Sequence, residues 1–345
     1  MPIETYSSSP VPAMERHMAR AQMAEALGFN AIWLRDVPFN VPSFGDAGQT
    51  FDPFVYLGAL ATQTSRIALG VASIILPLRH PAHVAKAAAT ADALSAGRLI
   101  LGIASGDRPD EYPALNQPFE RRGELFRESY DYIRQMGIDR PQFANAFGQV
   151  GGGIDMLPKP AGERLPLLVT GSSQQASEWI AANGDGWMTY PRPAGPQSQL
   201  IGDFRARIEA AGEADKPVME PLYLDLAADA DAPPTPIHLG IRAGINQLRE
   251  YLLTRHHIGV NHVALNLRFN RADIETTLAT LANEILPEFS NQDPNHDEDY
   301  LVDRGNRRHW PRDGQTTGRR RTHGTDTRPQ RNETGQYQGA PVGYS

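Results

Sequence analysis

The sequence contains no cysteine, and this absence excludes several classes of protein. Without thiols the chain has no disulfide framework, no cysteine metal site and no thiolate nucleophile. It also lacks a run of about 18 apolar residues, the length that a membrane-spanning helix needs. The first residues, MPIETYSSSPVPAMERHMAR, lack the basic start and apolar stretch of a secretory signal. We therefore expect a cytoplasmic protein that has no membrane partner.

Several motifs that carry chemistry are missing as well. The net charge of −7 gives no reason to expect nucleic acid as a partner. No H-E-x-x-H, no His/Asp/Glu cluster at metal spacing and no G-x-S-x-G nucleophile elbow occurs. No pair of carboxylates is placed for glycoside hydrolysis. We expect no metal site, and the absences favour a cofactor that does the chemistry.

The end of the chain differs in composition from the rest. Residues 291–345 lack Ile, Met and Phe and are rich in Arg, Asp, Gly, Asn, Gln and Thr. Such a segment cannot bury enough apolar area to offset the entropy that it loses on ordering. We expect a disordered tail at 291–345 and one folded domain at 1–290.

Strand-like and helix-like segments alternate through the first part of the chain. The strand candidates are continuous apolar runs, typical of a parallel sheet that is buried on both faces. They are residues 31–34, 66–75, 98–103, 165–170, 186–190, 218–226 and 262–267. The helix candidates are residues 11–27, 53–63, 80–94, 119–136, 174–183, 197–211, 241–257 and 272–286.

This alternation predicts an α/β fold, a (β/α)₈ TIM barrel, which takes about 250 residues. The first strand would be short or incomplete, because only Pro2–Tyr6 can supply it. A doubly wound open sheet is the alternative, but no G-x-G-x-x-G follows the first strand. Residues 143–160 form a longer connection, which we expect to be a hairpin or loop near the barrel mouth.

One stretch, LPLLVTGSSQQASEWIAANGDGWMTY, combines a buried strand, a Gly-Ser-Ser turn and a helix. Backbone N–H groups in such a turn and in the first helical turn have no internal partner, and the helix dipole favours an anion there. The stretch therefore predicts either a phosphate cup or a plain capped turn. Other strand ends also carry small polar groups, among them Ser73, Ser105 and Asn266.

The segment RIALGVASIILPLRHPAHVAKAAATADALSAGRLILGIASGD resembles the central part of the bacterial luciferase-like family of flavin-dependent oxidoreductases. The matching parts are the I-I-L-P-x-x-H-P turn at residues 74–81 and the L-S-x-G-R-L-x-L-G-I motif at residues 94–103. The similarity extends over residues 2–289. The chain is similar to the luciferase-type oxidoreductase subgroup, whose members carry WLRDVPF, FGDAGQTFDP and PPTPIHLG in these places.

The resemblance implies FMN lying across the carboxyl ends of the barrel strands. It implies a non-proline cis peptide at Ala72–Ser73 behind the flavin ring and a phosphate cup at residues 171–174. Trp187 and Thr189 would face the barrel mouth and touch the ring or the ribityl chain. The cofactor-binding residues that the resemblance implies are Ala72, Ser73, Ala104, Ser105, Gly106, Gly171, Ser172, Ser173, Gln174, Trp187 and Thr189.

The chain departs from the luciferases at the catalytic histidine that these enzymes carry after the second strand. Here Arg35-Asp36-Val37 stands in that place, which makes Asp36 the best candidate for an acid or base. His80, in the H-P turn, is the other catalytic candidate, although a capping or packing role is favoured for it.

From the resemblance we expect an FMN-dependent monooxygenase that acts on a small organic substrate with reduced flavin and O₂. NAD(P)H or a separate flavin reductase would supply the electrons, and a homodimer is expected. An F420 (deazaflavin)-dependent dehydrogenase is the alternative, although few basic residues are present for its longer anionic tail. A non-catalytic barrel that binds flavin or a phosphorylated metabolite is a third hypothesis.

Overall fold

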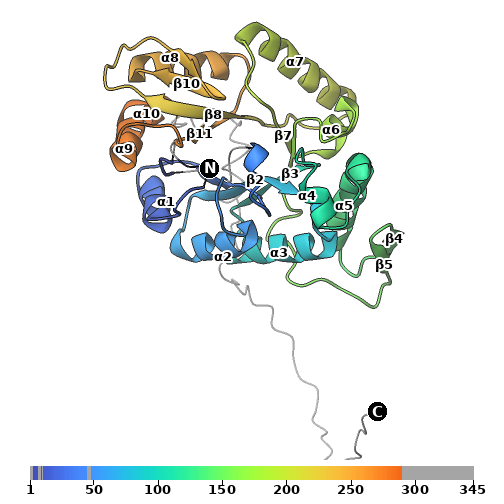
Figure 1. Ribbon diagram of the computed structural model, residues 1–345. Coiled ribbons are helices and arrows are strands. Elements are labelled where there is room, and N and C mark those ends of the chain that lie inside the picture. The colour runs from blue at the N-terminus through green and yellow to red at the C-terminus, as the bar shows by residue number, and fades with distance from the viewer. Residues whose placement is uncertain (1–2, 7–8, 10, 45–47, 290–345) are drawn as a thin grey trace, which may run out of the picture. The chain divides into compact units, whose positions relative to one another are not determined.

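Seven parallel strands form the wall of a barrel in the computed structural model, which describes residues 3–6, 9, 11–44 and 48–289 (Figure 1). Each strand pairs in parallel with the next one along the wall. In order, the strands are β1 Ala31–Leu34, β2 Ala68–Ile75, β3 Leu99–Ala104, β6 Leu167–Thr170, β7 Gly186–Met188, β8 Val218–Leu226 and β11 His262–Asn266. This arrangement confirms the TIM-barrel prediction.

Helices cover the outside of the strands (Figure 1). The long helices are α1 His17–Ala26, α2 Pro53–Gln63, α3 Pro81–Leu94, α5 Arg122–Met136, α6 Ser177–Asn183, α7 Ala194–Ala210, α8 Ile245–His257 and α9 Ile274–Glu284. The short ones are α4 Glu111–Ala114, α10 Leu286–Phe289 and the 3₁₀ turns η1 Pro42–Phe44, η2 Leu76–Leu78 and η3 Phe119–Arg121. None of the described helices is long and apolar enough to cross a membrane.

Local signals in the sequence explain where several helices begin. The Asp52 carboxylate accepts hydrogen bonds from the backbone N–H groups of Phe54 and Val55, and Pro53 takes the first helical position of α2. Proline suits that position because its missing N–H would have no partner there. The observed helices at 53–63 and 81–94 therefore agree closely with the expected ones.

The barrel interior is filled by one side chain from each of the seven strands. This cluster consists of Trp33, Ala68, Ile100, Leu168, Met188, Met219 and Ala264. Side chains alternate between the two faces of a strand, so these residues fix which face of each strand points inward. The residues between them point outward and pack against the helices.

The expected first strand is absent from the described residues. Ile3–Tyr6 form no strand, although the Tyr6 N–H donates to the Arg268 carbonyl and the Thr5 hydroxyl to the Asn270 carbonyl. The edges of β1 and β11 are instead joined by side chains, because the Trp33 Nε1–H donates to His262 Nε2 at 2.9 Å. The first strand is therefore incomplete, as the sequence predicted.

Two hairpins interrupt the alternation of strands and helices. β4 Phe143–Asn145 and β5 Gly148–Val150 confirm a hairpin in the 143–160 segment. This hairpin contacts Tyr132 and Glu128 of α5, so it packs on the outer helices instead of near the mouth as predicted. The expected tail at 291–345 lies outside the described residues.

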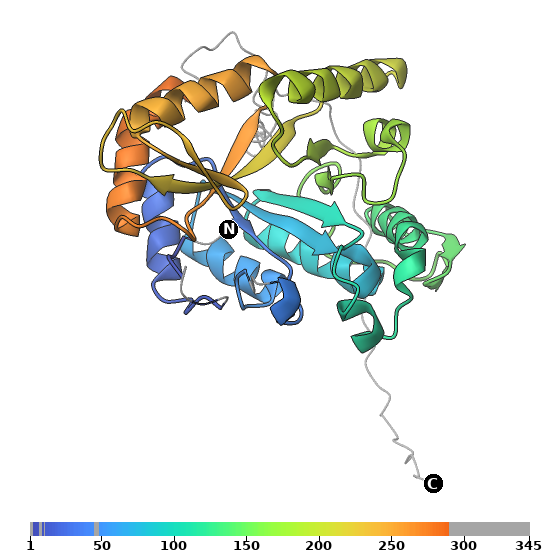
Figure 2. The ribbon, with the colours of Figure 1, turned by 45° about the horizontal axis from the view of Figure 1, so that its top comes forward.

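The second hairpin consists of β9 Thr235–Ile237 and β10 Gly240–Ala243 (Figure 2). The helix that the sequence predicted at 241–257 begins only at Ile245. Residues 240–243 join the sheet because β10 pairs with the end of β8, a long-range contact that no local pattern reveals.

Candidate active site at the strand ends

The carboxyl ends of the strands meet at one face of the barrel, where a TIM barrel carries its working groups. Continuing the alternation from the interior cluster places one inward residue at the end of each strand. These residues are Arg35, Ala72, Ala104, Thr170, Tyr190, Tyr223 and Asn266. We call this set the mouth ring.

Side chains from β2, β6 and β7 meet at the inner end of the mouth. We call these residues, Ser73, Thr170 and Met188, the floor. The Ser73 hydroxyl is hydrogen-bonded to the Thr170 hydroxyl, and the Thr170 hydroxyl also lies 3.4 Å from the Met188 sulfur. The peptide bond between Ala72 and Ser73 is cis, as the resemblance implied. These contacts place Ser73 beside β6 and β7; its contact with a flavin stays a prediction.

The end of β3 forms a tight corner next to this floor. The Tyr112 hydroxyl donates to the Ser105 carbonyl, which ties α4 to the strand end. A Cβ at Gly106 would lie 2.7 Å from Ile75 Cγ2 and 3.0 Å from the Tyr112 hydroxyl. The predicted set Ala104, Ser105 and Gly106 therefore forms a tight corner in which Gly106 has no room for a side chain.

Charged side chains surround the opening on the β1, β3 and β7 side. Desolvation raises the pKa of Tyr190, the charge of Asp107 raises it further, and Arg35 and Arg108 lower it. The Arg108 guanidinium lies over the Phe44 ring at 4.7 Å. Burial likewise raises the pKa of Glu111, which lies 3.8 Å from Arg108. This side of the mouth is therefore polar and of mixed charge.

The turn after β6 has the geometry of an anion cup. Gly171 has φ +56°, and Ser173 and Gln174 have φ +45° and +61°, so the backbone takes left-handed conformations. Left-handed residues in a tight turn direct backbone N–H groups into a concave surface, which is the geometry of many anion sites. Among the described residues, the N–H groups of Ser172 and Ser173 have no hydrogen-bond partner, and the Ser172 side chain is exposed. The cup thus offers donors without a positive side chain.

Neighbouring residues hold the cup in shape. The Ser173 hydroxyl donates to the Thr170 carbonyl at 2.7 Å, so it is used within the turn. The Gln175 side-chain amide donates to the Ser173 carbonyl and to the Gly123 carbonyl at the start of α5. Arg127 donates to Gln175 Oε1 from α5. The Ser173 hydroxyl is therefore used within the turn, whereas the Ser172 hydroxyl accepts from the Gln174 N–H at 3.4 Å and can still donate.

Helix α6 begins later than the sequence predicted. It starts at Ser177, and Ala176 at its N-cap makes no side-chain cap bond. The predicted start at Gln174 was wrong because the left-handed residues Ser173 and Gln174 cannot belong to a right-handed helix. The cup is thus built by a turn before the helix, and Gln174 contributes backbone from that turn.

Trp187 and Thr189 do not face the mouth, which corrects the expectation for both. The Trp187 ring packs on Phe204 of α7, and its Nε1–H donates to the Gly171 carbonyl at 2.8 Å. The Thr189 hydroxyl accepts from Arg192 at 2.9 Å. Met188 belongs to the interior cluster, so its neighbours on either side point outward. Trp187 supports the cup from behind.

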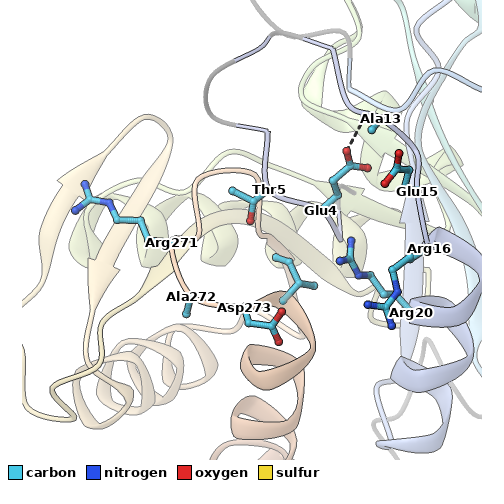
Figure 3. Close-up of a pocket in the computed structure, with 10 residues that line it drawn as sticks. Glu4, Thr5, Ala13, Glu15, Arg16, Arg20, Arg271, Ala272 and Asp273 are labelled. Carbon is cyan, nitrogen blue, oxygen red and sulfur yellow. Dashed lines mark hydrogen bonds between the residues drawn. The ribbon is translucent and has the colours of Figure 1, made fainter.

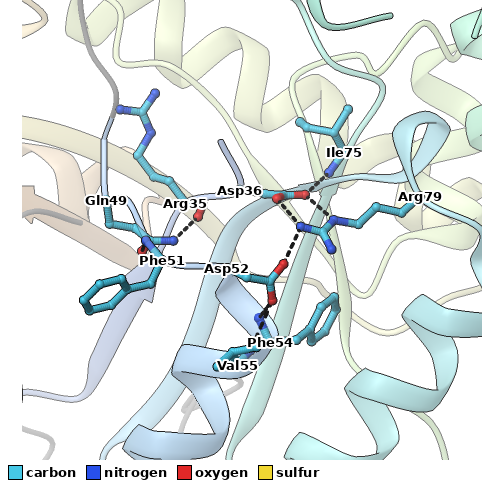
Figure 4. A network of polar contacts seen from close by, with 9 residues as sticks. All are labelled: Arg35, Asp36, Gln49, Phe51, Asp52, Phe54, Val55, Ile75 and Arg79. Carbon is cyan, nitrogen blue, oxygen red and sulfur yellow. Dashed lines mark hydrogen bonds and ion pairs between the residues drawn. The ribbon is translucent and has the colours of Figure 1, made fainter. Parts of the chain in front are cut away.

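Asp36 lies outside the mouth ring, in a buried ion-pair network (Figure 4). Its carboxylate accepts from Arg79 Nε at 2.9 Å, from Arg79 Nη2 at 2.7 Å and from the Ile75 N–H at 3.2 Å. Arg79 Nη2 also donates to Asp52 Oδ2 at 2.9 Å. All these bonds tie the end of β1 to the end of β2 and to the start of α2, which is a structural role.

The electrostatics of this network favour the charged forms of Arg79 and Asp52. Burial acts to lower the pKa of Arg79, but the hydrogen bonds and charges of Asp36 and Asp52 outweigh it and raise the pKa overall. Desolvation acts to raise the pKa of Asp52, while the hydrogen bond from Arg79 makes the net shift a lowering. The lowered pKa favours the charged form of the Asp52 carboxylate.

His80 is the N-cap of α3. Its Nδ1 accepts from the Ala82 N–H at 3.3 Å, and its Nε2 lies 3.3 Å from the Phe147 carbonyl. Its ring contacts Tyr132 and Phe147 edge-on. Both nitrogens are engaged with the outer layer, which favours the capping role over the catalytic one.

One described cavity lies away from the cup and the floor. It has a volume of about 490 Å³ and lies beside the starts of α1 and α9 (Figure 3). Its lining residues are Glu4, Thr5, Ala13, Glu15, Arg16, Arg20, Arg271, Ala272, Asp273 and Ile274. Its charges are matched, since Glu4 binds His17 and Arg16 pairs with Glu275. No cluster of three potential metal ligands occurs among the described residues.

Comparison with known protein families identifies the group to which this geometry belongs. The family model described as "Luciferase-like monooxygenase" matches residues 2–233. The chain belongs to the luciferase-like monooxygenase family. The resemblance in the sequence is thereby confirmed, and the family's enzymes include flavin-dependent and F420-dependent oxidoreductases.

The luciferase-like relatives differ in what they do. An uncharacterised protein of Mycobacterium tuberculosis is 33% identical over 190 residues, which are 50% of this chain and 67% of the relative. An F420-dependent hydroxymycolic acid dehydrogenase of the same species is 29% identical, over 57% of this chain and 55% of its own. The alkanal monooxygenase beta chain of Photorhabdus luminescens is 37% identical, over 41% of this chain and 44% of its own.

Solved structures share the luciferase-like fold. The monooxygenase RslO1 from Streptomyces bottropensis has a TM-score of 0.70 at 19% identity, covering 80% of this chain and 93% of its own. An F420-dependent secondary alcohol dehydrogenase has a TM-score of 0.67 at 17% identity, covering 79% and 94%. The oxygenating constituent of 3,6-diketocamphane monooxygenase of Pseudomonas putida, in complex with FMN, has a TM-score of 0.65 at 13% identity. The match covers 84% of this chain and 99% of its own. At these identities they show the fold alone.

The residues at the strand ends fit a phosphate-bearing flavin. Unpartnered N–H groups and one exposed hydroxyl at the cup match the oxygen atoms of a phosphate. One residue of this surface was missed from the sequence, Thr170 at the floor. Strand alternation counted from a known interior residue would have found it.

Proposed function

We propose that this luciferase-like protein is an FMN-dependent monooxygenase that oxygenates a small organic substrate. The observation that carries the proposal is the cup at residues 171–174 standing directly beside the floor of Ser73, Thr170 and Met188. A phosphate in the cup places the rest of a flavin across the strand ends. Bound reduced FMN supplies electrons, and its reaction with O₂ supplies the oxygen atom.

The chain's own residues bind and orient the cofactor in this proposal. The Ser172 and Ser173 N–H groups and the Ser172 hydroxyl bind the phosphate. Trp187 fixes the cup by its bond to the Gly171 carbonyl. Ala72, Ser73, Ala104 and Gly106 offer small surfaces against which a flat ring can lie. The mouth ring excludes water from the reacting atoms.

The choice of FMN over F420 depends on charge at the cup. The longer tail of F420 carries additional anionic groups, which call for arginine or lysine nearby. The arginines next to the cup are already engaged, since Arg127 binds Gln175 and lies over the Trp179 ring, and Arg122 lies 3.9 Å from the centre of the Phe119 ring. Neutral donors suit the single phosphate of FMN.

A titration with FMN and, separately, with F420 tests the assignment. We expect FMN to bind with quenched fluorescence and F420 to bind at least tenfold more weakly. Ser172→Asp should abolish FMN binding, because it places a negative charge against the phosphate, and Ser172→Ala should weaken it by about 1 kcal/mol. Ser198→Asp on the exposed side of α7 is the matched control. Equal FMN affinity in Ser172→Asp and the control would refute the cup.

Turnover is tested with a separate flavin reductase, NADH and O₂. Substrates to screen include decanal, because one relative is named an alkanal monooxygenase, and small cyclic ketones. The readout is oxygenated product by mass spectrometry. A protein that binds FMN but oxygenates nothing would favour a non-catalytic barrel.

A further inference from the structure

The β9–β10 hairpin inserts its tip into the barrel mouth. Tyr223 of β8 pairs with Asn266 of β11 on one side and with Gly240 of β10 on the other. β10 therefore continues the sheet on the side of β7, which has already ended at Met188. β10 runs parallel to β8, away from the barrel, and β9 runs antiparallel to β10. The tip of the hairpin at His238–Leu239 therefore points back toward the barrel.

The tip is held in place by contacts with the mouth ring. The Tyr223 N–H donates to the Leu239 carbonyl at 3.3 Å. The His238 ring lies 5.9 Å from the Tyr223 ring and 6.1 Å from the Phe269 ring, edge-on to both. Tyr223 is buried beneath this contact, whereas His238 itself is exposed. Two aromatic rings thus fix the orientation of an imidazole at the rim of the mouth.

In the part of the chain that the structure describes, His238 combines two free ring nitrogens, which the exposed His256 and His257 also have, with a fixed position against two aromatic rings. His17 is hydrogen-bonded to Glu4, His80 caps α3, and His262 accepts from Trp33. Among the described residues, neither ring nitrogen of His238 has a hydrogen-bond partner. A positioned imidazole with both nitrogens available can donate a proton from one nitrogen and accept one at the other.

We propose that His238 is the catalytic acid–base residue on the substrate side of the mouth. The protonated ring breaks one N–H bond as an O–H bond forms on a substrate oxygen that gains negative charge. The neutral ring then takes a proton back from water at its exposed face. This inference depends on the proposed function, and it assigns the acid–base role to a residue other than Asp36, which pairs with Arg79, and His80, which caps α3.

Chemical footprinting tests the position of His238 without turnover. Diethyl pyrocarbonate modifies accessible imidazole nitrogens, and peptide mass spectrometry measures the rate at each histidine. We expect saturating FMN to slow modification of His238 at least fivefold. The exposed His256 and His257 at the end of α8 serve as internal controls and should react at unchanged rates. An unchanged rate at His238 in protein that binds FMN would overturn the inference and leave the proposed function standing.

Substitution tests the chemical role. His238→Phe keeps a ring against Tyr223 and Phe269 but carries no proton. We expect kcat to fall by about 100-fold with FMN affinity unchanged, since general acid–base catalysis contributes on that scale. His257→Phe on α8 is the matched control. Full turnover by His238→Phe would refute the role, whereas loss of FMN binding in the parent protein would refute the proposed function and the inference together.

Discussion

At the scale of single residues, Asp36 shows how burial changes the meaning of a polar side chain. The side chain is 2% exposed, and its carboxylate accepts hydrogen bonds from Arg79 and from the Ile75 N–H. The position after β1 invites a catalytic interpretation in the sequence. In the structure, Asp36 joins the end of β1 to the end of β2.

Replacing Asp36 by Asn should destabilise the fold strongly. The substitution leaves the partly buried Arg79 guanidinium without its closest charge partner, and breaking such a pair costs about 3 kcal/mol. Urea denaturation measures the loss. Asp52→Asn is the matched control and should cost less than about 1 kcal/mol, because Asp52 is 42% exposed and Asn also caps helices well. An Asp36→Asn variant of normal stability and no turnover would restore the acid–base hypothesis.

Replacing Trp187 by Phe tests the outward position of that ring. Phe keeps the packing on Phe204 but loses the donor to the Gly171 carbonyl. We expect FMN affinity to fall about fivefold, roughly the worth of one hydrogen bond, with no change in the flavin absorption spectrum. The absorption maximum of bound FMN is the deciding measurement. A shifted spectrum would mean that Trp187 touches the flavin ring after all.

Sequence reasoning located these residues without fixing the face on which each lies. It found the Gly-Ser-Ser turn and the strand ends, because each has a local signature, and the family resemblance supplied the cis bond. It placed Trp187 and Thr189 on the wrong face of β7. Side chains alternate along a strand, so an error of one residue exchanges those that face the mouth with those that face the helices. The face on which each residue lies is decided by which residues fill the barrel interior. The interior is built by all the strands together, so one strand's sequence does not reveal it.

At the scale of elements, the β9–β10 hairpin depends on one glycine. A Cβ at Gly240 would lie 1.8 Å from the Tyr223 carbonyl oxygen, so only glycine allows β10 to approach β8. Gly240→Ala should detach the hairpin and raise the rate of proteolysis near residue 238 at least tenfold. Limited proteolysis with mass spectrometry measures the rate.

A second glycine provides the control for this variant. Gly202 in α7 has no atom within 4 Å of an added Cβ. Gly202→Ala should leave proteolysis of the hairpin unchanged and stabilise the helix by up to about 1 kcal/mol. Equal hairpin cleavage in Gly240→Ala and Gly202→Ala would show that the close approach to Tyr223 is dispensable.

At the scale of the whole molecule, the barrel is closed by a histidine that must stay neutral. Burial lowers the pKa of His262 to about 4, from about 6.5 in an unfolded chain. The unfolded state therefore binds more protons as the pH falls through this range. The stability is fully present above pH 6.5, and about 3 kcal/mol of it should be lost as the pH falls toward 4.

Denaturant titrations between pH 4 and pH 7 measure this effect. His262→Gln provides the control, because its amide oxygen can accept from Trp33 Nε1 without titrating. We expect the variant to lose much less stability than the parent over the same pH range. Parallel losses in both proteins would assign the acid sensitivity to other groups.

The barrel as a whole was predictable, but its closure was not. Alternating apolar runs and helices specify seven strand–helix units, and parallel units of this kind have few ways to pack. The closure depends on the contact between Trp33 and His262. The sequence around one of these residues gives no sign that the other is its partner. The β9–β10 hairpin escaped prediction for the same reason.

The bond between Trp33 and His262 also has a consequence for synthesis. It joins residues separated by 229 positions, so β1 emerges from the ribosome long before β11 exists. During that interval one edge of β1 has no neighbour, and an open strand edge is a template for association with other chains. We infer that the nascent barrel is most vulnerable to aggregation until residue 262 is translated, and that delays in translating the second half of the message would lower the yield of folded protein.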